Sequence, residues 1–412
     1  MSDIRPFRGI RPRPDLAAKI AAPPYDVVDF DEAVAYVADK PHSFLRIEKS
    51  EIQLAKGLET LDPRIFEKGR ETLQAWLAEG ALVRDPAPCF YLYRQRMGDH
   101  VQTGVVAGAS VAEYQRGLIK KHEHTRKDKE DERTTHVDVL SANTGPVFLT
   151  YRARPEVDAL VRRVCGRAPD VDLVSEDGIG HPLWVVSQPA EVAELRGLFA
   201  AIPHLYVADG HHRSAAASRV QQLRRARDPK PTGEAGYDFF LTVIFPHDQM
   251  KIMEYNRVVN DLNGLTEAAF LAKVGETFEV TDGAAASPGQ PRSYGMFLGG
   301  RWLRLAAKPG SFPEGDPVRS LDVAILQDNL LGPVLGIADP RTDKRIQFVG
   351  GIRGTAELER RARAKGGVAF ALYPTSIEQL MAIADADEVM PPKSTWFEPK
   401  LRSGMVVRSL DE

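Results

Sequence analysis

Residues 205–213, LYVADGHHR, bring four polar side chains together at the end of a short apolar run. The apolar residues 205–208 predict a buried strand, Asp209-Gly210 predicts a turn, and the Ala-rich and Arg-rich residues that follow predict a helix. The first turn of a helix leaves backbone N–H groups unpaired, and its dipole favours negative charge. We therefore predict a phosphate-binding turn made by Gly210, His211, His212 and Arg213.

Asp209 is the carboxylate of this turn. A carboxylate beside bound phosphates needs a cation or an acceptor hydroxyl between the negative groups, because like charges repel. Asp209 is therefore the first candidate for a ligand of Mg²⁺ or for a catalytic base. The alternative is a purely local role, in which the side chain bonds to a backbone N–H and shapes the turn.

Residues 117–138, GLIKKHEHTRKDKEDERTTHVD, carry interleaved charges of both signs and almost no apolar side chains after Ile119. One interpretation is a solvated helix with ion pairs between residues four apart. The other is a lid or substrate loop, because three histidines fall in the run and the apolar residues 147–149 follow it.

The lid interpretation supplies further candidates for the site. Glu123 and Asp138 are second choices for the base, and Glu48 in the N-terminal region is a further candidate. His122 and His124 could join Asp209 and His211 in a metal site, although the HExxH spacing of helical zinc proteases is absent. Four cations would close over phosphates or bind a substrate carboxylate: Lys120, Lys121, Arg126 and Arg133.

The composition limits the class of protein. The chain has 412 residues, of which 43% are hydrophobic and 27% charged, and this is typical of a globular protein with two or three cores. A formal net charge of -3 argues against binding to nucleic acid or to an anionic membrane. The two cysteines form no CxxC pair, and neither a secretory signal nor an apolar run of membrane-spanning length is evident. We expect a cytoplasmic protein, and no feature indicates its oligomeric state.

The remaining patterns predict a mixed α/β fold. Asp62-Pro63 predicts the start of a helix that Gly80 ends, and residues 89–97 with 103–111 predict a hairpin. A second hairpin with a Gly-Gly turn is expected over 292–306. Strands and helices then alternate toward the C-terminus. Residues 282–291, DGAAASPGQP, are the best linker candidate, so we predict domains at 1–280 and 291–412.

Several long segments resemble the DUF1015 family. They are RPFRGI, APPYDV, HSFLR, KKHEHTRKDKEDER, TGPVFLTYR, ADGHHRSAAASR and MPPKSTWFEPKL, and they span nearly the whole chain. The DGHHR element also resembles the phosphate-binding box of the ParB/sulfiredoxin superfamily, in which free-serine kinases carry a similar motif. The resemblance implies a ParB/sulfiredoxin-like nucleotide-binding core with additional N- and C-terminal elements.

The chain departs from two branches of that superfamily. Sulfiredoxins carry a catalytic Cys at the position of His211, so sulfinic-acid reduction by that route is excluded. ParB proteins carry Gly-Glu-Arg-Arg and a helix-turn-helix domain, and neither is found here.

The resemblance, taken with the predicted phosphate-binding turn, implies a kinase that transfers a phosphoryl group from ATP or ADP, with Mg²⁺, to the hydroxyl of free serine or a similar metabolite. Two alternatives stay open: a nucleotide-binding switch without catalysis, as in ParB, and a metal-dependent hydrolase of a phosphorylated metabolite.

Overall fold

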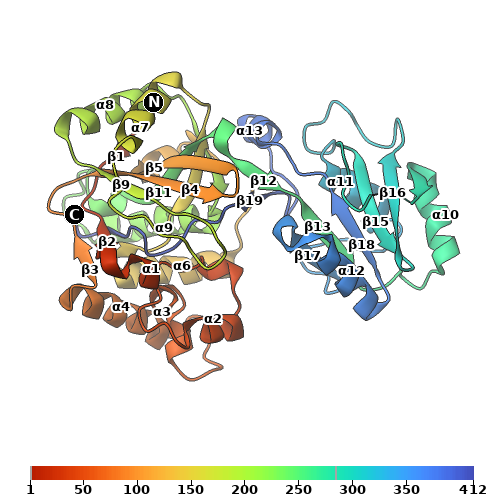
Figure 1. The fold of residues 1–412 in the computed structure, drawn as a ribbon, viewed down its shortest axis with the longest axis horizontal. Coiled ribbons are helices and arrows are strands. Elements are labelled where there is room, and N and C mark those ends of the chain that lie inside the picture. Colours follow the sequence, from red (N-terminus) through yellow and green to blue (C-terminus); the bar gives the residue numbers. More distant parts are fainter. Residues whose placement is uncertain (1, 284) are drawn as a thin grey trace. The chain divides into compact units, whose positions relative to one another are not determined.

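The computed structural model describes residues 2–283 and 285–412, which form two compact units (Figure 1). The first unit comprises Met1–Met250 together with Pro399–Glu412, and the second comprises Lys251–Glu398. These boundaries differ from the division at 280–291 expected from composition. The C-terminal residues also return to the first unit, which the sequence did not indicate.

The first unit is built on a mixed eight-stranded sheet with the order β6-β10-β8-β11-β5-β4-β9, in which β1 also pairs with β5. Strand β10 is parallel to β6, and β11 is parallel to β8, whereas the other neighbours are antiparallel. The strands are β1 (Ile4–Arg5), β4 (Phe90–Met97), β5 (His100–Ser110), β6 (Ile119–Lys120), β8 (Val147–Tyr151), β9 (Leu183–Val186), β10 (Leu205–Asp209) and β11 (Phe239–Pro246). The mixed α/β class predicted from the sequence is confirmed.

Helices cover both faces of this sheet. In the view of Figure 1, α7 (Pro155–Cys165) and α8 (Pro189–Ala200) lie above it, and α6 (Lys127–Leu140) and α9 (His211–Arg227) lie below. The smaller elements of this unit are β2 (Ile10–Pro12), α1 (Ala17–Ile20), α2 (Phe30–Val37), α3 (Leu45–Glu48), β3 (Leu82–Arg84), α5 (Val111–Gln115), β7 (Ala142–Asn143) and β20 (Arg408–Ser409).

Helix α4 (Pro63–Ala78) begins where the sequence predicts. The side chain of Asp62 accepts a hydrogen bond from the backbone N–H of Arg64 at 3.0 Å, and Pro63 occupies the first helical position. Gly80 follows the helix with a φ of +75°, a left-handed conformation that glycine adopts without strain.

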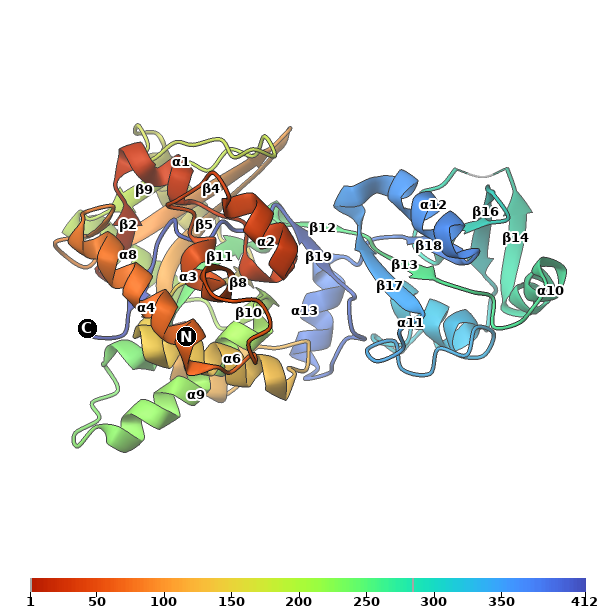
Figure 2. The ribbon, with the colours of Figure 1, turned by 90° about the horizontal axis from the view of Figure 1, so that it is seen from below.

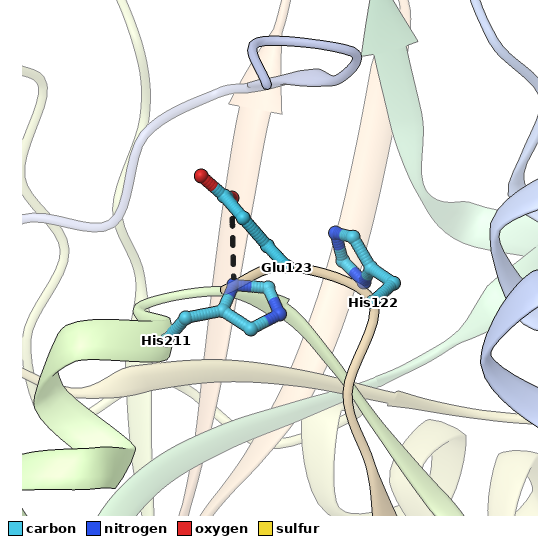
Figure 3. Close-up of side chains that lie close together, drawn as sticks. All are labelled: His122, Glu123 and His211. Atoms are coloured by element: carbon cyan, nitrogen blue, oxygen red, sulfur yellow. Dashed lines mark ion pairs between the residues drawn. The ribbon is translucent and has the colours of Figure 1, made fainter. Parts of the chain in front are cut away.

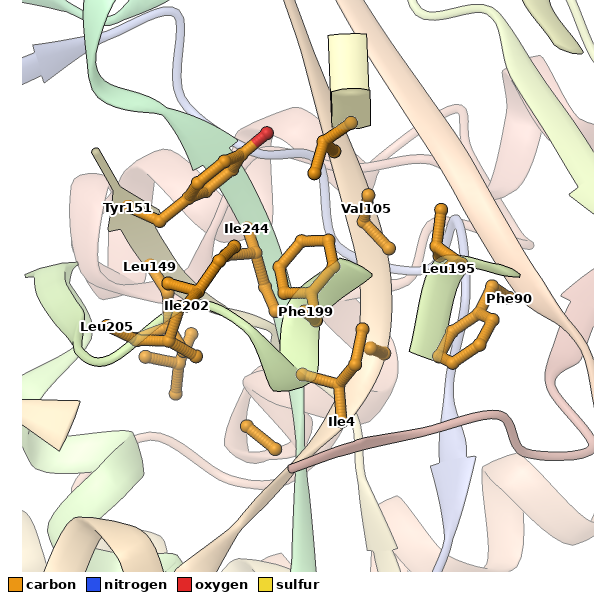
Figure 4. Packing of buried hydrophobic residues seen from close by; sticks show 14 of the residues in the cluster. Ile4, Phe90, Val105, Leu149, Tyr151, Leu195, Phe199, Ile202, Leu205 and Ile244 are labelled. Carbon is orange, nitrogen blue, oxygen red and sulfur yellow. The ribbon is translucent and has the colours of Figure 1, made fainter. Parts of the chain in front are cut away.

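The main core fills the space between the sheet and α7 and α8 (Figure 4). Leu149 and Ile244 of the sheet pack with Phe199 of α8 and Leu160 of α7, and all four are fully buried. This burial holds the central strands in place. Because β10 runs antiparallel to β8, the polar residues that follow β10 lie at the same end of the sheet as those that precede β8.

The second unit contains a six-stranded, antiparallel sheet with the order β14-β16-β15-β18-β13-β17. Its strands are β13 (Tyr255–Val259), β14 (Phe278–Asp282), β15 (Ser293–Leu298), β16 (Arg301–Ala307), β17 (Ile346–Gly350) and β18 (Val368–Leu372), and its helices are α10 (Glu267–Thr277), α11 (Asp322–Leu326), α12 (Gly354–Lys365) and α13 (Ile377–Asp385). Strand β12 (Lys251–Met253) pairs with β19 (Trp396–Glu398). Figure 2 shows both units from below.

The predicted linker lies inside this second unit. Strands β14 and β15, which flank it in the sequence, both pair with β16. A Gly-rich and Pro-rich stretch connects strands of one sheet as readily as it connects domains, so composition alone misplaced the boundary. The hairpin predicted over 292–306 is confirmed, because β15 and β16 meet across Gly299-Gly300.

The C-terminal segment is tied to the N-terminal unit by backbone hydrogen bonds. Strand β20 pairs with β7, and the N–H of Val407 donates to the carbonyl oxygen of Ile10 at 2.8 Å. Across the described residues, none of the helices combines the length and apolar character that crossing a bilayer requires.

Candidate functional site

The strand, turn and helix predicted for LYVADGHHR are present. Strand β10 ends at Asp209, Gly210 follows with a φ of +99°, and α9 begins at His211. A Cβ at Gly210 would lie 3.4 Å from the Cα of Val147, an ordinary contact distance, so it is the left-handed backbone rather than the space that favours glycine here. The first N–H bonded within the helix is that of Ser214, which donates to the Gly210 carbonyl at 3.0 Å. The N–H groups of residues 211–213 therefore have no partner within the helix.

Asp209 is ion-paired with a residue that the sequence did not place at the site. The Nζ of Lys400 lies 2.9 Å from the Oδ2 of Asp209. Burial favours the protonated carboxyl, but Lys400 and Arg213 outweigh it and hold the pKa of Asp209 well below its usual range. Asp209 is thus a fixed negative charge between two cations.

Arg213 lies at the same turn and is largely buried, with 14% of its side chain exposed. Its guanidinium donates to the carbonyl of Pro146 and, at 3.1 Å, to the Oδ2 of Asp26. The guanidinium also lies 5.7 Å from the ring centre of Tyr25. Desolvation alone would lower the pKa of Arg213, but Asp26 and the other neighbouring acids raise it, so the side chain is always charged.

A second buried guanidinium contacts the same tyrosine. Arg133, on α6, lies 3.9 Å from the ring centre of Tyr25 and pairs with Glu132. Its Nε has no hydrogen-bond partner among the described residues. A buried, charged donor without a partner is costly unless a ligand or water completes it.

Glu48 is buried between two hydroxyl groups. Its Oε1 accepts from the Oγ1 of Thr144 at 2.8 Å, and its Oε2 accepts from the Oγ of Ser403 at 2.7 Å. A Cβ at Gly145 would lie 2.8 Å from the Oε1 of Glu48, so glycine allows this approach. Both carboxylate oxygens have partners, which suits Glu48 to positioning the loop before β8.

Two cavities adjoin these residues. The smaller has a volume of about 20 Å³, room for one water molecule, and is lined by residues that include Tyr25, Glu48, Arg133 and Arg213. The larger measures about 130 Å³ and shares Glu48, Arg133 and His136 with the first. The structure therefore brings three of the predicted site residues, Glu48, Arg133 and Arg213, around one small cavity.

Three other predicted residues meet at the start of α9 (Figure 3). The Oε2 of Glu123 lies 3.8 Å from the Nδ1 of His211, and the rings of His122 and His211 meet edge to face with centres 4.4 Å apart. The histidines are 2% and 5% exposed, whereas the side chain of Glu123 is 41% exposed. The side chain of His211 thus faces Glu123 and His122.

Both histidines are neutral. Desolvation lowers the pKa of His122 to about 4, and the negative charge of Asp209 opposes that shift only in part. Desolvation and the neighbouring His122 bring the pKa of His211 well below its usual range.

The other predicted cations and rings lie nearby with local partners. The Nε2 of His212 accepts the backbone N–H of Arg126 at 3.0 Å, which ties the 122–126 loop to α9, and the Arg126 side chain is exposed and paired with Asp128. Lys120 lies on β6 beside β10, whereas Lys121 is exposed and lies 4.7 Å from the ring centre of Tyr114. His124 is exposed and is not part of the three-residue group.

Asp138 is not brought to the turn. Its carboxylate accepts from Arg224 at 2.9 Å and from Arg227 at 3.1 Å, near the last turns of α9. Arg224 lies 13 residues beyond His211, which is about 20 Å along a helix. The prediction of Asp138 as a base is therefore corrected: it holds α6 to the far end of α9.

The charged segment is mostly helix α6 rather than an open loop. Ion pairs four and three residues apart, Lys127 with Asp131 at 2.7 Å and Lys129 with Glu132 at 3.5 Å, fit the solvated-helix interpretation on one face. The opposite face buries Arg133, Thr134 and His136. The segment thus contributes polar groups to the cavities. Its role as a lid stays a prediction.

Lys400, Tyr25 and Ser403 were missed by sequence reasoning. Lys400 belongs to MPPKSTWFEPKL and Tyr25 to APPYDV, two of the segments that carry the family resemblance, so a signal for both was present. Only the fold shows that they meet the DGHHR turn.

The chain belongs to the family described as "Protein of unknown function (DUF1015)", whose model matches residues 4–324. The predicted family is thus confirmed. A search of curated proteins found no match.

Among solved structures, the chain resembles a free serine kinase in complex with AMP, with 14% identity, a TM-score of 0.35, and coverage of 71% of this chain and 86% of that one. It also resembles a conserved hypothetical protein from Pyrococcus furiosus, with 13% identity, a TM-score of 0.36, and coverage of 75% and 96%. A third similar structure is SbnI with C-terminal truncation from Staphylococcus aureus, with 10% identity, a TM-score of 0.35, and coverage of 72% and 85%. Because identities and TM-scores are low, the function must come from the geometry of this chain.

Proposed function

We propose that the protein is a nucleotide-dependent kinase that transfers a phosphoryl group to the hydroxyl of free serine or a similar small metabolite. The proposal rests mainly on the turn after β10, where the N–H groups of residues 211–213 have no partner within the helix and where Arg213 and Lys400 both lie close to Asp209. Phosphoryl transfer requires positioning and charge neutralisation, and these groups supply both.

The phosphates of ATP or ADP would lie on this turn. The N–H groups of residues 211–213 and the dipole of the 17-residue helix α9 favour an anion, and Gly210 lets it approach the backbone. Lys400 adds a positive charge from the C-terminal segment. Arg133 faces the cavity beside Arg213 and would hold an anionic group of the nucleotide or a substrate carboxylate.

We assign the catalytic base to Glu123 rather than to Asp209. A base must take a proton from the acceptor hydroxyl, and Asp209 does so poorly while Lys400 and Arg213 stabilise its charged form. Glu123 is half-exposed and stands at the start of α9, where an acceptor could approach from solvent. Asp209 would instead orient Lys400 toward the phosphates.

The surroundings of Asp209 do not fit a Mg²⁺ ion held by the protein. A single carboxylate that already contacts an ammonium group offers little to a cation that prefers several oxygen ligands. The sequence-based assignment of Mg²⁺ to Asp209 therefore finds no support in this geometry. Mg²⁺ bound to the nucleotide phosphates would arrive as part of the substrate.

The kinase and its two alternatives, a nucleotide-binding switch and a hydrolase of a phosphorylated metabolite, predict different results in one experiment. The protein is incubated with ATP, ADP or CTP and a panel of hydroxyl-bearing amino acids, and both nucleotide consumption and acceptor phosphorylation are measured. Transfer that requires the acceptor supports the kinase. Binding without consumption would indicate a switch, and release of phosphate from a phosphorylated metabolite would indicate a hydrolase.

A further inference from the structure

We propose that His122, Glu123 and His211 form a binding site for a transition-metal ion of the zinc type, and that the bound ion blocks Glu123. The three residues offer two imidazole nitrogens and a carboxylate oxygen that all lie within 4.8 Å of one another. Two histidines with one carboxylate form a common ligand set of Zn²⁺ sites that keep an open coordination position.

The ring of His122 has a nitrogen that finds no partner in the chain. Its Nδ1 is buried and has no hydrogen-bond partner among the described residues, whereas the Nδ1 of His211 already faces Glu123. Buried ring nitrogens normally find a partner, because burial without one costs free energy.

The spacing needs only a small adjustment. Metal–ligand distances of 2.0–2.2 Å with tetrahedral geometry place ligand atoms about 3.4 Å apart. The Oε2 of Glu123 and the Nδ1 of His211 are already 3.8 Å apart. The remaining pairs lie within 4.8 Å, so a pair at that limit would close by about 1.4 Å when the ion binds.

The surrounding charges act in both directions. Asp209 lies near both rings and favours a cation, whereas Lys121 lies near His211 and opposes one. Imidazole ligands favour Zn²⁺ over Mg²⁺, which prefers oxygen atoms. The site is therefore distinct from any Mg²⁺ that accompanies a nucleotide.

Metal binding stands apart from the proposed kinase function, and only its inhibitory effect rests on that function. An ion bound to the carboxylate of Glu123 neutralises its negative charge and lowers its basicity, so the carboxylate accepts a proton from a hydroxyl less readily. Zn²⁺ should therefore inhibit phosphoryl transfer, and a chelator should restore it.

The test is equilibrium dialysis of the metal-free, full-length protein against Zn²⁺ without nucleotide, with Co²⁺ absorption as a probe of imidazole ligation. We expect one ion per chain and a loss of affinity of at least 10- to 100-fold in Glu123→Gln and His211→Gln. His124→Gln is the matched control, because this exposed residue of the same loop should leave the affinity unchanged.

Equal Zn²⁺ affinity in the wild type and Glu123→Gln, or absence of stoichiometric binding, would overturn the proposal. Glu123 is half-exposed, so this variant is expected to fold even if the buried His211 does not tolerate substitution, and circular dichroism checks both. Zn²⁺ binding in a protein without kinase activity would refute the proposed function and leave the metal site standing.

Discussion

The Nζ of Lys400 lies 2.9 Å from the Oδ2 of Asp209, although 191 residues separate them in the sequence. The contact is possible because residues 399–412 return to the first unit, where Ser403 also bonds to Glu48. The C-terminal segment thus completes the environment of the DGHHR turn, and its ammonium group is one of the charges that would meet a phosphate.

Replacing Lys400 with Met should weaken nucleotide binding by about 10- to 100-fold, the effect of losing a hydrogen bond to a charged group. The variant also removes the ammonium group paired with Asp209, so the carboxylate repels phosphate more strongly. Isothermal titration calorimetry measures the affinity, with Lys127→Met at an exposed position of α6 as the control. Unchanged affinity in Lys400→Met would place the phosphates elsewhere.

Arg213→Lys should lower nucleotide affinity by about tenfold or more, because lysine keeps the charge but loses the planar, two-pronged donor. Arg219→Lys is a matched control on the same helix, since Arg219 pairs with Asp131 on the outer side. If both variants bind nucleotide equally well, Arg213 has no part in binding, and its contacts with Asp26 and Pro146 are structural only.

Glu123→Gln should reduce turnover by at least about 10²-fold while nucleotide affinity stays close to normal, as expected for removal of a general base. Asp138→Asn provides the comparison, because Asp138 pairs with Arg224 and Arg227 away from the turn. That variant should lose some stability and keep its turnover. Steady-state kinetics on both, with kcat and KM separated, decides between the two carboxylates that the sequence ranked equally.

The free energy of unfolding should fall when the pH drops below about 6.5. Desolvation lowers the pKa of His122 to about 4 and of His181 to about 3, so the folded chain leaves these rings neutral while the unfolded chain protonates them. Between pH 6.5 and its pKa in the folded chain, each histidine then lowers the free energy of unfolding by about 1.4 kcal/mol per pH unit.

Urea unfolding at pH 7, 6 and 5 with a chelator measures this dependence. His181→Gln should make it shallower, because Gln retains hydrogen-bonding groups for Tyr93 and Ser175 but takes up no proton. A slope that is identical in the variant would show that His181 is not held neutral.

Local patterns were sufficient for the elements that depend on neighbouring residues. The strand, Gly turn and helix of 205–227 and the hairpin at Gly299-Gly300 follow from turn chemistry and apolar spacing. The ranking of the carboxylates was not accessible in this way. The three carboxylates differ in their partners: Asp209 meets Lys400, Glu123 meets His211, and Asp138 meets Arg224. Each of these contacts joins residues that lie far apart in the sequence.

The charged segment shows the same limit. Its composition indicates solvent exposure, yet α6 buries Arg133 and His136. That burial is tolerated because Tyr25 stacks on Arg133 and Glu48 contributes a negative charge nearby, and both belong to the N-terminal region. The predicted domain boundary was misplaced for a related reason, since only strand pairing distinguishes an interdomain linker from a loop that connects two strands of one sheet.

The most direct test of the proposed kinase is ³¹P NMR of the purified protein with ATP or ADP and free serine. The account predicts a new phosphomonoester signal that requires both the nucleotide and the acceptor, and that is nearly lost in Glu123→Gln. A nucleotide that binds but remains intact with every hydroxyl-bearing acceptor in the panel would contradict it.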